Sequence, residues 1–416
     1  MRLRVVVAAA LAVALGAMAA TAGASSGRAQ ANKLTVWLQV DAQTGWPDVV
    51  ANATQQFQQQ NPGWTVSVQY QNWGDHLQKF DATIAGNDTP DVIEMGNTEM
   101  TAYMASGAFA DLTSSKGQFP NSGSWLAGLA KSGEYGGKLY GVPYYAGSRV
   151  VTYRSDLFKK AGVTKDPTSV TQLTADLQKV AAMEKGVKGF TPMYLAGTDW
   201  YSALDWLFDY GGSIATTHAH KWVGTLDSPA SIAGLTAYKS FFDTVSSQRA
   251  ATLDEDNPAP YTVYSQGLTA AILGPAWFSC CTGNKYKAVT AQFVMPSHTA
   301  GKPIPGFLGG SDLAIPAQSG NKSQAIQWIA DFTNSSNEQS LQAKGNIPNA
   351  TNLLANTVNA RAAARSWFVP QAKHWVDVEN GNILRTMLAQ ILTGKLTVKQ
   401  AASTASANIA YTLNQS

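Results

Sequence analysis

Residues 136–154 read GGKLYGVPYYAGSRVVTYR, and this stretch decides how the rest of the chain is interpreted. Its glycines predict a turn, and Pro143 favours an extended backbone after that turn. Two tyrosines then precede a gap of small residues, and a β-rich run follows as far as Arg154. The pattern indicates either a strand that continues through a hinge and displays aromatic rings there, or an ordinary buried strand.

The first 31 residues have the pattern of a secretory signal peptide. Arg2 and Arg4 precede an apolar run over residues 5–15, and A-x-A cleavage motifs end at residues 24 and 31. The apolar run is too short to be a good membrane-spanning helix. We therefore expect the protein to be exported, and to be extracellular or associated with the cell surface.

Charge and cysteine content narrow the class of protein. The chain of 416 residues has 30 basic and 27 acidic side chains, and three of the arginines lie in the leader. The remainder is formally neutral, which does not favour nucleic acid or an anionic membrane as a partner. The length favours two domains. The adjacent Cys280 and Cys281 form either a vicinal disulfide or two buried thiols, and both alternatives stay open.

Strand and helix patterns alternate after the leader. Strands are predicted at 33–40, 65–70 and 91–95. One helix is predicted to begin at Pro47, a second to end near Gly86 and a third to end at Ser106. A second series follows, with a strand at 192–195 and helices that begin near Ser169 and Ser228. Alternation of this kind predicts an α/β fold with a parallel sheet.

Several of these motifs together resemble the family 1 extracellular solute-binding proteins, the sugar receptors of bacterial ABC importers. The resemblance covers nearly the whole mature chain, and the motifs occur in the order of the family. They lie at 34–37, 89–92, 107–112, 137–162, 267–277, 309–316, 345–348 and 369–370. The segment 95–98 and the many tryptophans most resemble actinobacterial receptors for N,N′-diacetylchitobiose and related chitin fragments.

The resemblance implies a type II periplasmic-binding-protein-like fold of two α/β lobes. A hinge would be crossed near 145–150, 307–312 and 360–370, which makes the lobes discontinuous: 32–147 with 311–365, and 148–310 with 366–416. The resemblance also implies an oligosaccharide ligand, the permease subunits of an ABC transporter as partners, and a monomer. Gram-positive sugar receptors usually carry a lipobox cysteine after the apolar run, and this chain has none there.

Candidate ligand-binding residues lie in loops after predicted strands and at the three crossings, where strand ends of both lobes would face one cleft. Aromatic rings cover the apolar faces of a sugar, and polar side chains bond its hydroxyl groups. The resemblance adds that Trp375, or else Trp367, stacks on the ligand, with its ring facing a wet cleft. The candidates are Asp41, Gln43, Asn97, Glu99, Tyr144, Tyr145, Ser148, Asp199, Trp200, Trp277, Gly310, Ser311, Asp312, Trp367 and Trp375.

Catalytic motifs such as HExxH, GxSxG and a phosphate-binding loop do not occur in the sequence after the predicted leader. We therefore expect a binding protein rather than an enzyme, without catalytic residues, cofactor or metal. Receptors for cellobiose, xylobiose, maltose or trehalose are alternatives. A secreted carbohydrate-active enzyme is another, because its two carboxylates need not be adjacent in sequence. A binder of a polyamine or metal ion is a third alternative, and it requires an acid-rich cleft.

Overall fold

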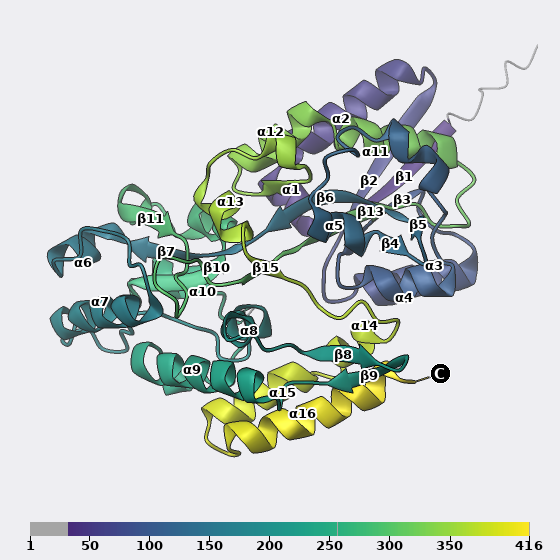
Figure 1. Cartoon of the computed structure of the whole chain (residues 1–416). Helices are drawn as coiled ribbons and strands as arrows, with labels where there is room; N and C mark the ends of the chain where they lie inside the picture. Colours follow the sequence, from purple (N-terminus) through teal and green to yellow (C-terminus); the bar gives the residue numbers. More distant parts are fainter. Residues whose placement is uncertain (1–31, 256, 416) are drawn as a thin grey trace, which may run out of the picture.

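The computed structural model describes residues 32–255 and 257–415, so the predicted leader lies outside the described residues. A six-stranded sheet in the order β14-β6-β13-β3-β1-β2 forms one half of the molecule (Figure 1). In this sheet β1 (Asn32–Gln39) pairs in parallel with β2 (Trp64–Gln71) and β3 (Val92–Gly96). Helices α2 (Pro47–Gln60) and α3 (His76–Gly86) connect these strands, as the alternating pattern predicts.

The prediction of a parallel sheet is wrong for the other three strands. β13 (Gly309–Ala314) runs antiparallel to both β3 and β6 (Gly141–Gly147), and β14 (Ile347–Pro348) runs antiparallel to β6. β13 enters this sheet as the chain returns from the other half of the molecule. Its direction is therefore not set by a βαβ crossover, which is the connection that makes neighbouring strands parallel.

The second half contains a three-stranded sheet in which β7 (Arg149–Arg154) lies between β10 (Ala271–Pro275) and β11 (Thr290–Phe293), antiparallel to both. The strand predicted at 192–195 is reduced to isolated bridges, one of them between Tyr194 and Ile272. The main helices are α7 (Val170–Met183), α8 (Trp200–Asp209), α9 (Pro229–Val245), α15 (Ile383–Leu392) and α16 (Val398–Leu413). Ser169 and Ser228 cap α7 and α9 through their side chains, as predicted.

The stretch 136–154 connects the two sheets. β6 ends at Gly147 and β7 begins at Arg149, so Ser148 alone separates strands of different sheets. Two more segments pass between the halves as the parallel pair β12 (Gly306–Phe307) and β15 (Ser366–Trp367). The stretch therefore continues from one sheet into another, as the first alternative predicts, but Tyr144 is buried in the core, as the second alternative predicts.

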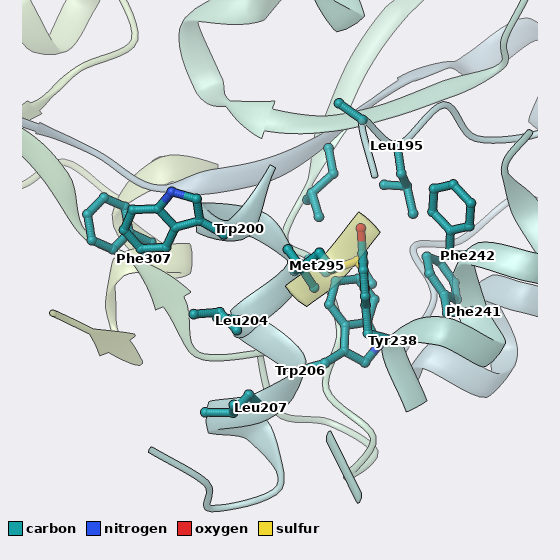
Figure 2. Packing of buried hydrophobic residues seen from close by; sticks show 14 of the residues in the cluster. Leu195, Trp200, Leu204, Trp206, Leu207, Tyr238, Phe241, Phe242, Met295 and Phe307 are labelled. Carbon is teal, nitrogen blue, oxygen red and sulfur yellow. The ribbon is translucent and has the colours of Figure 1, made fainter. Parts of the chain in front are cut away.

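Each half has its own apolar core. One core packs β1 and α2 against α11 (Lys322–Phe332), through residues such as Leu34, Phe57 and Trp328. The other core lies among α8, α9, α15 and α16, and Figure 2 shows part of it, including the packed rings of Trp206 and Tyr238. We call the half with the six-stranded sheet the first unit and the half with the three-stranded sheet the second unit.

Ser155 is the first residue of α6 (Ser155–Lys160), and its hydroxyl donates to the carbonyl oxygen of Val289 at 2.8 Å. Cys281 is disulfide-bonded, which favours the disulfide alternative because the sequence contains only one other cysteine. Within the described residues, no helix has both the length and the apolar character needed to cross a bilayer.

Candidate ligand-binding site between the two units

The loops after β1, β2 and β3 carry a linked set of polar side chains. Trp73 Nε1 donates to Asp41 Oδ2 at 2.6 Å, and His76 places Nδ1 2.9 Å from the carbonyl oxygen of Trp73. His76 Nε2 lies 2.9 Å from Glu99 Oε2, which also accepts a 2.8 Å hydrogen bond from the Gly96 amide. Carboxyl ends of adjacent parallel strands meet at one edge of a sheet, so this network forms one face of the first unit.

His76 is buried, yet both of its ring nitrogens face acceptors. Only the imidazolium form can donate from both nitrogens. Burial opposes the positive charge, but the hydrogen bond and charge of Glu99, with the Trp73 carbonyl, outweigh it and raise the pKa of His76 above its ordinary value. The network therefore pairs a buried cation with a carboxylate at the edge of the first unit.

Arg149, the first residue of β7, organises the second unit's side of the junction. Its Nε donates to Ser202 Oγ at 2.9 Å, and its Nη2 lies 3.2 Å from Glu255 Oε2 and 3.7 Å from Asp199 Oδ1. The guanidinium carbon lies 5.0 Å from the centre of the Tyr201 ring. Burial disfavours the charge of Arg149, but Asp199 and Glu255 raise the pKa above its ordinary value.

An aromatic cluster lies beside Arg149. The Trp200 ring centre is 3.9 Å from that of Tyr201, 6.0 Å from that of Trp375 and 6.3 Å from that of Trp367. Figure 2 shows Trp200 next to Phe307, whose ring centre lies 6.0 Å away. Such edge and tilted contacts between rings stabilise the cluster beyond its area burial.

The prediction that the ring of Trp375 or Trp367 faces a wet cleft is wrong. Trp375 is 1% exposed and Trp367 is 6% exposed, and both belong to the apolar core of the second unit. Polar neighbours in sequence misled the prediction for Trp375, because Asp377 of α14 (Trp375–Asn380) is exposed while the apolar side of the helix packs on α15 and α16. Trp200 is also buried.

Tyr144 and Asp312 do not face the junction either. Tyr144 is fully buried in the core of the first unit, where its hydroxyl accepts a hydrogen bond from Trp46 Nε1. Asp312 is fully buried next to Gly141, and burial raises the pKa of its carboxyl group to about 7. Successive residues of a strand point to opposite faces, and the sequence did not show which face is covered.

Other candidates hold the crossing segments in place. Asn97 donates through its amide nitrogen to Leu308 O at 3.1 Å and through its backbone to Gly310 O at 2.9 Å. A Cβ at Gly310 would lie 2.1 Å from Tyr145 O, so only glycine fits there. Ser148 and Ser311 are fully buried beside the crossings. These residues position the backbone of the crossings.

The remaining candidates are accessible in part. Asp41, Glu99, Tyr145 and Trp277 are half-buried, and Gln43 is exposed on the short helix α1 (Val40–Gly45). Asp199 is buried and caps α8 by accepting from the Ser202 amide at 3.3 Å.

The two units touch at both ends of this region. At one end α14 packs on α4 (Met100–Ser106), and Thr98 Oγ1 donates to Glu379 Oε2 at 3.4 Å. At the other end Gly345 of the first unit approaches Trp277, whose Cα lies 3.5 Å from where a Cβ of Gly345 would be.

Sequence reasoning missed Trp73, His76, Arg149, Tyr201 and Glu379. The rule of searching loops after strands would have found Trp73 and His76, because both follow β2. The spacing of four residues between Trp375 and Glu379 on one helix was a signal for the hydrogen bond that joins them. Nothing local in the sequence distinguishes Arg149 or Tyr201.

Within residues 32–255 and 257–415, no group of three or more His, Cys, Asp or Glu side chains is arranged to hold a metal ion. His218 ends β8 (Ala215–His218), His220 lies in the turn before β9 (Lys221–Gly224), and both are exposed. Cavities of about 320 and 120 Å³ lie in the second unit, and neither is lined by a residue of the junction.

Two α/β units joined by three crossing segments, with polar and aromatic side chains where they meet, define a type II periplasmic-binding-protein-like fold. The chain belongs to the bacterial extracellular solute-binding protein family, whose model matches residues 52–365. It is similar to the diacetylchitobiose binding protein DasA of Streptomyces coelicolor, with 29% identity over 342 residues, 79% of each chain.

Other relatives agree with this assignment. A maltooligosaccharide ABC transporter solute-binding lipoprotein of Streptococcus pneumoniae is 24% identical over 364 residues, which are 85% of this chain and 79% of that protein. The GacH receptor of Streptomyces glaucescens has the same fold, with a TM-score of 0.77 at 19% identity over 92% of this chain and 99% of that chain. These relatives are solute-binding proteins and a receptor, not enzymes.

Proposed function

We propose that this protein captures a neutral oligosaccharide between its two units and delivers it to the permease of an ABC importer. N,N′-diacetylchitobiose or a related chitooligosaccharide is the proposed ligand. The observation that carries the ligand assignment is the similarity to the diacetylchitobiose binding protein over 79% of both chains. The half-exposed rings of Trp73 and Trp277, one from each unit, support it because aromatic faces suit the apolar faces of a pyranose.

We place the ligand between the lobes 32–147 with 311–365 and 148–310 with 366–416. Within this site we propose Asp41, Glu99, Tyr145 and Trp277 as ligand contacts, and we add Trp73. The polar side chains would form hydrogen bonds with the N-acetyl and hydroxyl groups of N,N′-diacetylchitobiose. These hydrogen bonds would distinguish one sugar from another. The protein is proposed to act as an exported monomer that closes around the ligand.

Calorimetric titration tests the proposal with N,N′-diacetylchitobiose, cellobiose, xylobiose, maltose and trehalose. We expect one molecule of N,N′-diacetylchitobiose per chain, and a smaller radius of gyration by X-ray scattering when the ligand is saturating. A complete absence of heat for all five sugars contradicts a sugar receptor. Binding of another disaccharide in preference to chitobiose keeps the receptor function and replaces the ligand.

A glycosidase is the second candidate function, and one observation favours it. Glu379 has a pKa raised to about 7 by burial and by the nearby charge of Glu99, which is the combination that a general acid and its partner carboxylate require. Incubation of the pure protein with N,N′-diacetylchitobiose tests it directly. We expect no N-acetylglucosamine to form, because the relatives are solute-binding proteins.

A further inference from the structure

The side chain of His76 lies between two residues that are proposed above as ligand contacts. Its Nδ1 atom is 2.9 Å from the carbonyl oxygen of Trp73, and its Nε2 atom is 2.9 Å from Glu99 Oε2. The rings of His76 and Trp73 also meet edge to face, with centres 5.2 Å apart and planes at 85°. Only 1% of the His76 side chain is exposed, so the imidazole is shielded from a ligand. Any effect of His76 on binding must therefore act through its neighbours.

The Glu99 carboxylate is anchored by one of its two oxygens. Among the described residues, the partners of this carboxylate both engage Oε2: the Gly96 amide, which donates at 2.8 Å, and His76. The other oxygen is left for a ligand, and 14% of the side chain is exposed. The preceding residue, Thr98, donates to Glu379 of the second unit at 3.4 Å, so this segment borders the junction. A hydroxyl or amide group of a sugar can donate to Oε1 while Oε2 stays anchored.

Trp73 is held at both its backbone and its ring. Its carbonyl oxygen faces His76, its Nε1 donates to Asp41 Oδ2 at 2.6 Å, and 39% of the residue remains exposed. Gly96 separates this ring from the Glu99 carboxylate, because a Cβ at Gly96 would lie 3.4 Å from Trp73 Cζ3 and 2.9 Å from Glu99 Oε2. The exposed ring and the two carboxylates therefore belong to one network, and His76 is its buried member.

We propose that His76 is a positioning residue for sugar recognition, which holds the Glu99 carboxylate and the Trp73 segment in the arrangement that the ligand meets. This inference rests on the proposed function, because both neighbours are contacts only if the sugar binds at the junction. The link to Glu99 carries the larger part of the effect. It joins an imidazolium to a carboxylate, whereas the Trp73 ring is also held by Asp41.

Two substitutions of His76 separate its two links. Glutamine places its amide nitrogen near the position of Nε2 and keeps a donor for Glu99, whereas asparagine places its amide nitrogen near Nδ1 and keeps a donor for Trp73. The dissociation constant of N,N′-diacetylchitobiose is measured by calorimetry for the full mature chain, at pH 6, below the raised pKa of His76. We expect His76→Asn to weaken binding about tenfold or more, and His76→Gln to stay within about threefold of the wild type.

A double-mutant cycle distinguishes positioning from a general loss of structure. If His76 acts through Glu99, then His76→Asn has nothing left to position once Glu99→Ala is present. The double variant should therefore bind within about twofold of Glu99→Ala alone. A general loss of structure would instead lower the affinity by the same factor in both backgrounds.

Two further variants give an independent probe and a control. Gly96→Ala leaves His76 unchanged but displaces the flexible end of the Glu99 side chain, so it should weaken binding about as much as His76→Asn does. His298→Gln removes the contact between His298 Nδ1 and Asp209 Oδ2, which lie 2.7 Å apart in the second unit, and it should bind like the wild type. Circular dichroism and melting temperatures check that each variant is folded during the titration.

Three results overturn the proposal: equal affinity in the wild type and His76→Asn, an equal loss in His76→Asn and His76→Gln, or the same loss from His76→Asn with and without Glu99→Ala. If none of the five sugars binds, the proposed function fails, and hydrogen exchange of the Gly96 amide in the ligand-free protein decides about His76. That amide is bonded to Glu99 Oε2. Faster exchange in His76→Asn than in the wild type and His76→Gln supports the positioning of Glu99, and equal exchange in all three overturns it.

Discussion

Asp205 Oδ1 accepts a 2.7 Å hydrogen bond from Trp367 Nε1, which ties helix α8 to the third segment that passes between the two units. The same oxygen accepts from the Phe307 amide at 3.1 Å, in the strand that pairs with the segment of Trp367. Asp205 also lies in the field of Arg149, the first residue after the first crossing. One carboxyl group on α8 therefore interacts with all three crossing segments.

Replacement of Asp205 by alanine should destabilise the protein. The change leaves two buried donors without an acceptor, which costs roughly 2–4 kcal/mol of the free energy of unfolding. Asp205→Asn retains an acceptor and should cost less, because burial already raises the pKa of this carboxyl group well above its ordinary value. Urea denaturation measures both. The surface variant Asp243→Asn, which breaks the pair with Lys239, should lose about 0–1 kcal/mol.

Trp375→Ala should lower stability first and affinity only as a consequence. The ring is 1% exposed in the core of the second unit, so its truncation should cost roughly 3–5 kcal/mol of the free energy of unfolding. Tyr411→Ala, at a side chain that is 74% exposed in the same unit, should change stability by less than about 0.5 kcal/mol. An unchanged melting temperature with lost sugar binding would restore the original prediction that Trp375 stacks on the ligand.

Trp277→Ala and Trp73→Ala should show the opposite behaviour. Both rings are accessible in part, and each belongs to one unit at the proposed ligand site. Each variant should weaken sugar binding by roughly 10–30-fold and should shift the melting temperature little. Trp222→Ala provides the control, since Trp222 is half-buried on β9, away from the junction. Equal affinities in the wild type and in both variants would remove these rings from the site.

His76→Gln should reduce stability in a pH-dependent way. The pKa of His76 is raised in the folded protein, so the stabilising contribution of the imidazolium is complete below its ordinary value of 6.5 and is lost as the pH rises through the raised value. We expect the wild type to be more stable than the variant by about 1–2 kcal/mol at pH 6, and by less at pH 9. His218→Gln, at an exposed strand position, should show no such difference.

The resemblance to solute-binding proteins predicted the family, and the match of the family model to residues 52–365 confirms it. Local patterns predicted many elements well: the strand expected at 33–40 corresponds to β1, and Pro47 begins α2 as expected. These features depend on hydrophobic periodicity, proline geometry and side-chain caps, all of which involve residues close together in the chain. The stretch 136–154 likewise showed from its own residues that a strand could continue past Ser148.

The tertiary structure alone decided the direction of β13, the burial of Trp375 and Tyr144, and the hydrogen bond between Thr98 and Glu379, which are 281 residues apart. Each depends on which element packs against another after the chain has returned from the second unit. A side chain's exposure is set by those distant neighbours, and the polar residues beside Trp375 in sequence carry no information about them.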